Sequence, residues 1–264
     1  MLVIAHRGAN REATENSWDA FEKAIAAGAT RLELDVQLSR DGHAVVMHDD
    51  QLGRTTACKG RISTMNADDL RALRLINGDS VPFLHEVVER LLPRIELNIE
   101  IKGTSTRLAA VVAEQVALHP LRDKVIVSCF HFEPLVWLKE HLPELQRACL
   151  WSSDTFSWPF FATLAPQVFL DKVGTTILHP HVGLVNENLM DQAASRGWQV
   201  YAWVPMAGEE DDREAMWTAM KTLGLHGLCT NYPRQLRAWL DDAAIDERLY
   251  SDGQVAKTES NQSF

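Results

Sequence analysis

The sequence predicts an α/β fold, a (β/α)8 TIM barrel with a small insertion after the second strand. Short apolar runs recur along the chain with helical patterns between most of them, and eight of these runs have strand character. The length of 264 residues suits one barrel domain. A doubly wound open sheet is the alternative, but the chain lacks a GxGxxG or GxxxxGK[ST] nucleotide loop, which weakens it. The eight predicted strands cover residues 2–6, 31–36, 95–102, 125–130, 147–151, 175–179, 198–204 and 225–230.

Amphipathic helical patterns connect these runs. The stretch SWDAFEKAIAAG places Trp18, Phe21 and Ile25 on one face and ends at Gly28, a residue type that often ends helices. A helix with one apolar face can pack on the outside of a barrel. Further helices are expected at 84–92, 106–118, 133–142, 190–197 and 210–224.

Residues 43–48, HAVVMH, do not fit the barrel repeat. Only four residues, ending in Asp-Gly, separate them from the second strand, whereas a parallel crossover needs about ten or more. Such a short connection predicts a hairpin. In the simplest pairing His48 lies opposite Glu33 and Val46 lies opposite Asp35, so the imidazole and both carboxylates share one face.

We expect residues 1–249 to form a single domain. The segment 49–83 is polar and rich in turns, with one short helix near 66–73, and we interpret it as a subdomain inserted into the barrel. The polar tail at 250–264 is expected to be disordered.

The composition argues against several classes of function. Lys and Arg number 26 against 36 Asp and Glu, and no basic stripe appears, so we expect no nucleic-acid partner. No apolar run approaches ~18 residues, so no membrane span is expected. Cys129, Cys149 and Cys229 lie in apolar runs, and no basic and apolar leader precedes the first strand. We therefore expect a reducing, cytoplasmic location.

Acidic side chains gather on two neighbouring strands of the predicted barrel. Glu33 and Asp35 alternate with apolar residues, and Glu100 lies near the end of the 95–102 strand. In a barrel this polar set faces the interior, near the carboxyl ends of the strands where active sites lie. Carboxylate oxygens favour Mg²⁺ or Ca²⁺ over zinc. Taken alone, the polar column at 95–102 could instead be an internal salt-bridged ladder.

Two histidines and two cations accompany these carboxylates. His6 and Arg7 end the first strand, His48 ends the hairpin, and Lys102 follows Glu100. Two imidazoles suit the two proton transfers of a displacement, and fixed cations compensate phosphoryl charge. Together with a metal, these groups predict a site that cleaves phosphodiesters.

The chain resembles the glycerophosphodiester phosphodiesterase family over roughly residues 3–233. The matching motifs, in order, are HRGANREATENSWDAF, ELDVQLSRDGHAVVMHDDQLGRTT, VPFLHEVV, NIEIK, SCF, YAWV and LHGLCTNYP. The resemblance implies a barrel with an insertion after the second strand. It also implies metal-dependent hydrolysis of glycerophosphodiesters to sn-glycerol 3-phosphate and an alcohol, with a small-molecule diester as the partner.

The resemblance also implies roles for individual residues. Glu33, Asp35 and Glu100 match the metal ligands, and His6 and His48 match the acid–base pair.

Four further residues match positions around these groups. Arg7 and Lys102 match residues that contact phosphate. Glu15 and Asn16 match a Glu-Asn pair expected to lie beside the metal or to support its ligands.

Two aromatic residues are candidates for the lining of the pocket. Phe130 ends the fifth strand and is expected to line the pocket, and Trp203 is expected either to pack on substrate or to serve as a core aromatic residue. The chain departs from the family at Thr14, at 204–206, and at Asn231, which replaces a common Asp. The inserted segment is the expected source of selectivity for the alcohol.

Several alternatives stay open at this stage. His179 and His181 suit either a loop role or substrate contact. A barrel glycosidase is one alternative, but it would not need the two histidines and two cations together. A catalytically silent barrel that acts as a binding module is another. Such a module would be expected to have lost one of the metal ligands or one of the histidines. The residues do not decide which histidine is acid or base, nor whether water attacks directly or a cyclic phosphate forms first. They also leave open Mg²⁺ against Ca²⁺ and the oligomeric state.

Overall fold

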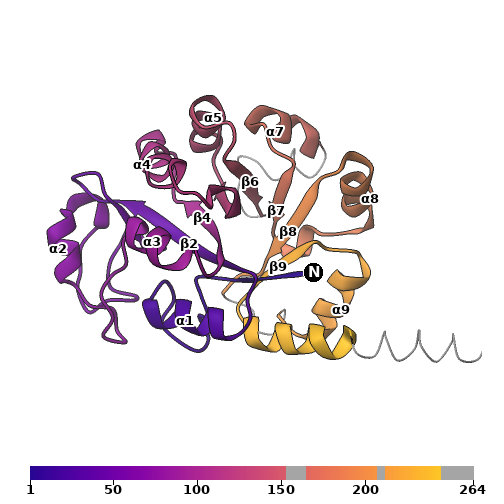
Figure 1. The fold of residues 1–264 in the computed structure, drawn as a ribbon, viewed down its shortest axis with the longest axis horizontal. Helices are drawn as coiled ribbons and strands as arrows, with labels where there is room; N and C mark the ends of the chain where they lie inside the picture. Colours follow the sequence, from indigo (N-terminus) through magenta and orange to yellow (C-terminus); the bar gives the residue numbers. More distant parts are fainter. Residues whose placement is uncertain (153–164, 207–211, 245–264) are drawn as a thin grey trace, which may run out of the picture.

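The computed structural model of the chain describes residues 1–152, 165–206 and 212–244. Parallel strands form a closed barrel with helices around it, which confirms the predicted fold class (Figure 1). The strand order is β1-β9-β8-β7-β6-β5-β4-β2, and β1 also pairs with β2, so the ring closes. β3 is bonded to the outer edge of β2 and lies outside this ring.

The eight predicted barrel strands are present, with their ends within about two residues of the predicted ones. Each is a short run of mostly buried residues. They are β1 (Leu2–Ala5), β2 (Arg31–Leu38), β4 (Glu96–Ile101), β5 (Val125–Cys129), β6 (Gln146–Trp151), β7 (Ile177–Pro180), β8 (Gln199–Trp203) and β9 (Gly227–Thr230).

The predicted helices are also present, and two were not predicted. Around the barrel, the described residues form α1 (Trp18–Ala26), α3 (Leu84–Leu91), α4 (Thr106–Ala117), α5 (Phe132–His141), α7 (Pro166–Val173), α8 (Glu187–Arg196) and α9 (Glu214–Thr222). A further helix covers 233–244. The unpredicted ones are α7 and this last helix. Short 3₁₀ turns lie at η2 (Arg122–Lys124) and η3 (Val182–Leu184).

Caps explain the helix ends that differ from the sequence pattern. α8 begins three residues before the predicted start because the side chain of Asn186 accepts a hydrogen bond from Leu189 N, which caps the helix there. α7 has Pro166 at its first turn and a left-handed Gly174 just after its end.

Two apolar layers hold the barrel. The larger fills the space between the strands and the helices, where alternate residues such as Leu34 and Ile99 point outward. The smaller lies inside the barrel and includes Ile4, Ile177 and Tyr201. This inner layer closes the barrel beneath the carboxyl ends of the strands and forms the floor of the site.

The hairpin pairs with a register one residue away from the predicted one. β3 (Ala44–Val46) runs antiparallel to β2, with Val36 opposite Val46, so the expected pairing of Asp35 with Val46 is wrong. Gly42 has φ +94°, a left-handed conformation that tightens the connection, and the backbone N of Ser39 donates to the carbonyl of His43. The loop is therefore one residue shorter than expected.

The segment 49–83 contains η1 (Ile62–Thr64) and α2 (Ala67–Ala72), the latter near the predicted short helix. In Figure 1 it lies outside the ring of helices, beside β2 and α3. It has an apolar cluster of its own, the satellite cluster, which supports the proposal of an inserted subdomain. The cluster consists of Val45, Met47, Leu52, Ile62, Ala67, Leu70, Leu75, Val81 and Phe83.

The predicted disordered tail at 250–264 lies outside the described residues. Among the described helices, none combines the length and the apolar character that crossing a bilayer requires.

Candidate active site

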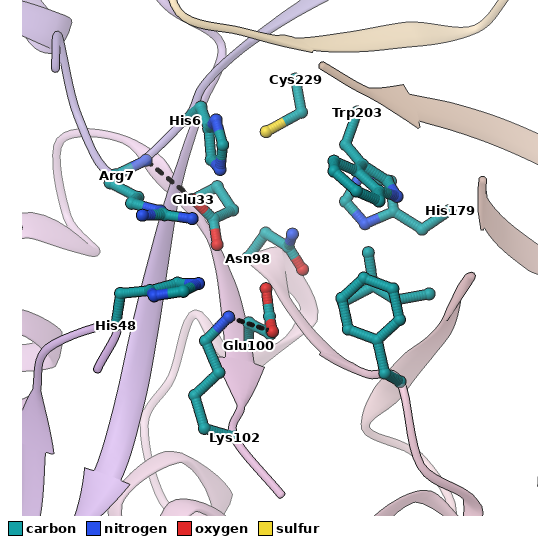
Figure 2. A pocket seen from close by; sticks show the side chains of 12 residues that line it. His6, Arg7, Glu33, His48, Asn98, Glu100, Lys102, His179, Trp203 and Cys229 are labelled. Carbon is teal, nitrogen blue, oxygen red and sulfur yellow. Dashed lines mark hydrogen bonds and ion pairs between the residues drawn. The ribbon is translucent and has the colours of Figure 1, made fainter. Parts of the chain in front are cut away.

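A pocket opens at the carboxyl ends of the barrel strands (Figure 2). Its volume is about 110 Å³, several times the roughly 10–15 Å³ that one water needs, so it can hold a small polar group. One part of its wall is charged and the other is largely aromatic and apolar. The charged part contains Arg7, Lys102, Glu33 and Glu100, together with the imidazoles of His6 and His48. The pocket therefore brings together most of the predicted site residues.

Three buried carboxylates form a cluster beside this pocket. Glu33, Asp35 and Glu100 each offer an oxygen, and these oxygens all lie within 4.8 Å of one another. The parallel register of β2 and β4 sets Asp35 opposite Glu100. Alternation along the two strands turns all three side chains to the barrel interior. The structure thus gathers the three residues predicted as metal ligands.

Two cations contact the cluster. Lys102 Nζ lies 2.7 Å from Asp35 Oδ1 and also pairs with the Glu100 carboxylate, as Figure 2 shows. Arg7 Nε lies 3.2 Å from Asp35 Oδ2. The backbone N of Arg7 donates to Glu33 Oε2 at 2.8 Å. Asp35 is therefore the best compensated of the three carboxylates.

The pKa values of the three carboxylates differ according to how closely the two cations approach each of them. Burial raises the pKa of Glu33 well above its usual range, and the charges of Asp35 and Glu100 raise it further. Burial also raises the pKa of Glu100. Burial opposes the charge of Asp35, but Lys102 and Arg7 outweigh it and hold the pKa of Asp35 below its usual range. Three carboxylates share two cations, so one negative charge is left without compensation.

The donor set fits a divalent cation. Glu33 Oε1 is buried and has no hydrogen-bond partner among the described residues. A buried carboxylate oxygen is normally paired or coordinates a metal. Three carboxylate oxygens in one cluster are the hard ligands that Mg²⁺ and Ca²⁺ prefer. The residues present could therefore hold either ion.

The turn after β1 positions Arg7. Arg7 and Asn16 have φ values of 55° and 54°, left-handed conformations that non-glycine residues seldom adopt. Asn16 N donates to the Arg7 carbonyl, and Asn16 Nδ2 donates to Asp35 Oδ2 at 2.8 Å. Gly8 is required between them, because a Cβ there would lie 2.7 Å from a backbone carbon of Ala20. Strain in this turn is balanced by its bonds to the cluster.

Glu15 pairs with Arg7 and does not belong to the carboxylate cluster. Its Oε1 accepts from Arg7 Nη1 at 2.9 Å, and both of its oxygens accept from the guanidinium of Arg54 at 2.6 Å. Arg54 Nε donates in turn to Asp49 at 2.6 Å. Because Arg54 belongs to the segment 49–83, this chain of ion pairs ties that segment to the barrel.

His6 is held by a neutral amide. Its Nδ1 lies 2.9 Å from Oδ1 of Asn231, which also accepts a hydrogen bond from Asn10 Nδ2. Asn231 cannot turn freely, because its own Nδ2 donates to the Pro205 carbonyl. An amide oxygen only accepts, so the His6 proton sits on Nδ1 and Nε2 is left as an acceptor. Burial and the nearby Arg7 charge lower the pKa of His6 to about 3.

His48 is held by a carboxylate instead. Its Nδ1 lies 2.7 Å from Asp49 Oδ1. In the observed register, a regular strand would carry His48 to the face of Leu34, away from the pocket. β3 ends at Val46, however, and the chain then turns, so His48 lines the pocket with Glu33. The predicted proximity of these two residues is present although its predicted register is wrong.

An aromatic wall faces the charged residues. Phe130 follows β5 and Trp203 ends β8, and their rings meet edge to face at 5.7 Å. Both line the pocket, as does His179 of β7 (Figure 2). His181 lies against the ring of Trp203 at 5.0 Å. This wall is suited to pack against the carbon atoms of a ligand.

Several residues of the site were not predicted. Asp49 and Arg54 lie inside a matching motif, shortly after His48, but their ion pairs depend on how the segment 49–83 folds. Asn98 lies in the polar column of β4, and Asn231 was noted only as a departure from the family. The alternation of β4 could have pointed to Asn98. Closure of the predicted barrel sets the end of the first strand beside the end of the last, and this could have pointed to Asn231 beside His6.

Comparisons with known proteins agree with this geometry. The sequence model of the glycerophosphoryl diester phosphodiesterase family matches residues 6–235. The chain is 30% identical to a glycerophosphodiester phosphodiesterase of Bacillus altitudinis, over 88% of this chain and 94% of that protein. A protein of the same description from Caldanaerobacter subterraneus is 29% identical, over 89% and 96%.

A solved structure has a similar fold. It is a phosphodiesterase of Oleispira antarctica in complex with the product sn-glycerol-3-phosphate. The TM-score is 0.79 at 26% identity, and the match covers 91% of this chain and 97% of that one. The likeness extends over the whole barrel.

Proposed function

Because this chain belongs to the glycerophosphoryl diester phosphodiesterase family, we propose that it hydrolyses glycerophosphodiesters to sn-glycerol 3-phosphate and an alcohol, using a divalent metal and two histidines. The observation that carries the proposal is one pocket that combines a carboxylate cluster, two imidazoles and two cations. The product bound to the Oleispira antarctica relative supports the choice of product.

Glu33, Asp35 and Glu100 would hold the metal, Mg²⁺ or Ca²⁺, through the cluster described above. When bound, such an ion polarises a phosphoryl oxygen and neutralises charge that develops on it. The residue that gains most from an added cation is Glu33, whose Oε1 has no partner among the described residues and whose pKa burial raises. Lys102 and Arg7 supply further positive charge toward the phosphoryl group.

The different partners of the two histidines support different roles. His6 is kept neutral by burial, with Nδ1 bonded to an amide and Nε2 open to accept a proton. It is therefore suited to act as the general base that deprotonates the nucleophile. His48 faces the Asp49 carboxylate, which stabilises an imidazolium that can protonate the leaving alcohol.

Positioning is the other contribution of these side chains. Asn231 and Asp49 each hold one ring nitrogen, so both imidazoles are oriented before substrate arrives. Arg7 is fixed by Glu15 and Asp35, which leaves little freedom for its guanidinium. Preorganised donors of this kind stabilise a transition state without having to reorganise during the reaction.

The four cysteines of the chain are free, and three of them are buried. This supports the expected cytoplasmic location, because thiols persist in a reducing compartment.

Hydrolysis of glycerophosphocholine by the purified chain, with and without EDTA, tests the proposal. We expect release of sn-glycerol 3-phosphate and choline that EDTA stops and excess Mg²⁺ or Ca²⁺ restores. His85→Leu, a change at an exposed histidine on α3, serves as the matched control and should keep full activity. Activity that survives EDTA, or no activity on any glycerophosphodiester at saturating metal, would refute the proposal.

A further inference from the structure

One arginine that does not line the pocket connects two residues that do. Arg54 Nε donates to Asp49 Oδ2 at 2.6 Å, and Asp49 Oδ1 lies 2.7 Å from His48 Nδ1. The two terminal nitrogens of Arg54 donate to the two oxygens of Glu15, each at 2.6 Å. Glu15 Oε1 also accepts from Arg7 Nη1 at 2.9 Å. A single guanidinium is therefore one side chain away from the proposed acid and one side chain away from a cation of the pocket.

These contacts use two edges of the guanidinium of Arg54. The Nη1 and Nη2 atoms form a bidentate pair with Glu15, and Nε is left for Asp49. A lysine would carry the same charge on a single nitrogen, so it cannot reproduce this planar geometry. Arg54 therefore fixes the orientation of two carboxylates in addition to compensating their charge.

The carboxylate of Asp49 depends on Arg54 for its orientation. Among the residues that the structure describes, its side chain bonds to His48 and Arg54 alone. Burial raises the pKa of Asp49, but hydrogen bonds from Arg54 and His48 outweigh burial and hold the pKa below its usual range. Asp49 is thus an ionised acceptor for both partners. Without Arg54, this carboxylate is free to rotate, and the imidazole loses its fixed partner.

The backbone on either side of Arg54 is anchored. Leu52 packs in the satellite cluster. Thr55 is 9% exposed, and its carbonyl accepts a hydrogen bond from Ile76 N. Because the chain around it is held, the guanidinium of Arg54 can impose a position on the two carboxylates.

The ion pairs of Arg54 are better suited to position groups than to stabilise the fold. The side chain of Arg54 is 46% exposed, and ion pairs at such exposed sites contribute little to the free energy of unfolding. Glu15 keeps Arg7 as a partner when Arg54 is removed. Small displacements of catalytic groups nevertheless cost large factors in rate. Figure 2 shows Arg7 and His48 on the same side of the pocket, where one support can serve both.

We propose that Arg54 is a positioning residue of the enzyme, which orients His48 through Asp49 and Arg7 through Glu15. It thereby holds the proposed acid and a cation of the phosphoryl site in fixed relative positions. The inference rests on the proposed function, and it assigns a role in that reaction to a side chain of the segment 49–83.

Rates with two leaving groups test this role. Arg54→Leu is assayed at saturating metal with glycerophosphocholine and with the 4-nitrophenyl ester of sn-glycerol 3-phosphate. We expect kcat to fall by ~10- to 100-fold with choline as the leaving alcohol, the size of loss that misplaced groups produce. The loss should be several-fold smaller with 4-nitrophenol, because that group leaves as its anion and needs no acid. The Tm should stay near that of the wild type.

Two further variants complete this comparison. Arg54→Lys keeps the charge without the fork, so it should also be impaired, and it keeps the test decisive if Arg54→Leu does not fold. Arg61→Leu is the matched control. Arg61 belongs to the same segment, and its Nε lies 3.8 Å from an oxygen of Asp50, away from the site. This variant should keep the wild-type rate with both leaving groups.

Double-mutant cycles show whether Arg54 acts through its two partners. Arg54→Leu is combined with Asp49→Ala and, separately, with Glu15→Gln, which keeps the shape of the side chain but breaks the bidentate pair. Each partner substitution already removes part of the effect of Arg54. The loss caused by Arg54→Leu with choline should therefore be smaller in either background than in the wild type, by about 3-fold or more.

Four results would overturn the positioning role. They are an Arg54→Leu rate equal to that of Arg61→Leu, equal losses with both leaving groups, an undiminished loss in either double variant, and full activity in Arg54→Lys. A loss of activity that appears only where the Tm falls below the assay temperature would make the role purely structural. Any of these results in a wild-type enzyme that cleaves glycerophosphocholine would refute the positioning role alone. A wild-type protein with no turnover on any glycerophosphodiester would refute the proposed function, and this inference with it.

Discussion

The Nδ1 atom of His6 lies 2.9 Å from Oδ1 of Asn231, whereas the Nδ1 atom of His48 lies 2.7 Å from a carboxylate oxygen of Asp49. One imidazole of the pocket therefore has a neutral partner and the other has a charged one. This difference gives each proposed role its structural basis, and it can be altered by single substitutions.

Asn231→Asp should give His6 a charged partner. A carboxylate beside an imidazole favours the protonated ring, so the pKa of His6 rises from its lowered value of about 3. A base with a higher pKa stays protonated to higher pH, and the acidic limb of the kcat/KM profile should move up by about one pH unit. The measurement is kcat/KM for glycerophosphocholine from about pH 2.5 to 9, a range that includes the wild-type limb. An acidic limb that stays where it is in the wild type would show that His6 is not the base.

His48→Ala should lose activity in a way that depends on the leaving group. With choline as the leaving alcohol, we expect kcat to fall by ~10²–10⁴, the usual contribution of a general acid. With 4-nitrophenol, which leaves readily as its anion, the loss should be small. His6→Ala should instead be impaired with both, because a base acts before the leaving group departs. Equal losses with both leaving groups in His48→Ala would argue against its role as the acid.

Glu33→Gln should separate metal binding from stability. The substitution removes a buried carboxylate whose pKa burial raises, so the metal-free variant should be at least as stable as the wild type. It also removes one oxygen ligand, so added Mg²⁺ or Ca²⁺ should raise its Tm less and at higher concentration. Thermal melts across a metal titration measure both effects. An unchanged response to metal would exclude Glu33 as a ligand.

His179→Leu should flatten the acid dependence of stability. The folded-state pKa of His179 is lowered to about 3 from an ordinary value of 6.5, because burial opposes the charge. Between these two values the unfolded chain binds a proton that the folded chain does not, so stability falls as the pH falls from about 6.5 toward 3. The contribution is about 1.4 kcal/mol per pH unit at most. Urea unfolding at pH 7, 5.5 and 4.5 compares the slopes, and identical slopes in both proteins would contradict the expectation.

Much of the barrel was predictable because its signals are local. Each strand is a short run of apolar or alternating residues, and the sequence around Glu33, Asp35 and Glu100 already shows which side chains share the interior face. The motifs also brought His6 and His48 to the same site. These features depend on periodicity and on the closure of a ring, both of which sequence patterns describe well.

The hairpin register and the partners of the site residues depended on individual conformations and hydrogen bonds that sequence patterns do not show. The register of the hairpin depends on the left-handed conformation of Gly42. With this register, a longer β3 would have placed His48 on the face of the strand that points away from the pocket. The partner of His6 is Asn231, at the other end of the chain, and no local pattern connects two residues so far apart. Arg54 likewise reaches Glu15 only because the segment 49–83 folds back on the barrel.

The satellite cluster bears on the order in which activity and the global fold are lost on heating. His48 follows directly from Val45 and Met47, which pack in that small cluster and not in the core of the barrel. Small apolar clusters open at lower free energy than the main core of a protein. We therefore expect inactivation to precede global unfolding, with loss of activity tracking hydrogen exchange in residues 45–83 while the eight barrel strands stay protected. We expect the barrel to set the melting temperature and residues 45–83 to set the temperature at which catalysis stops.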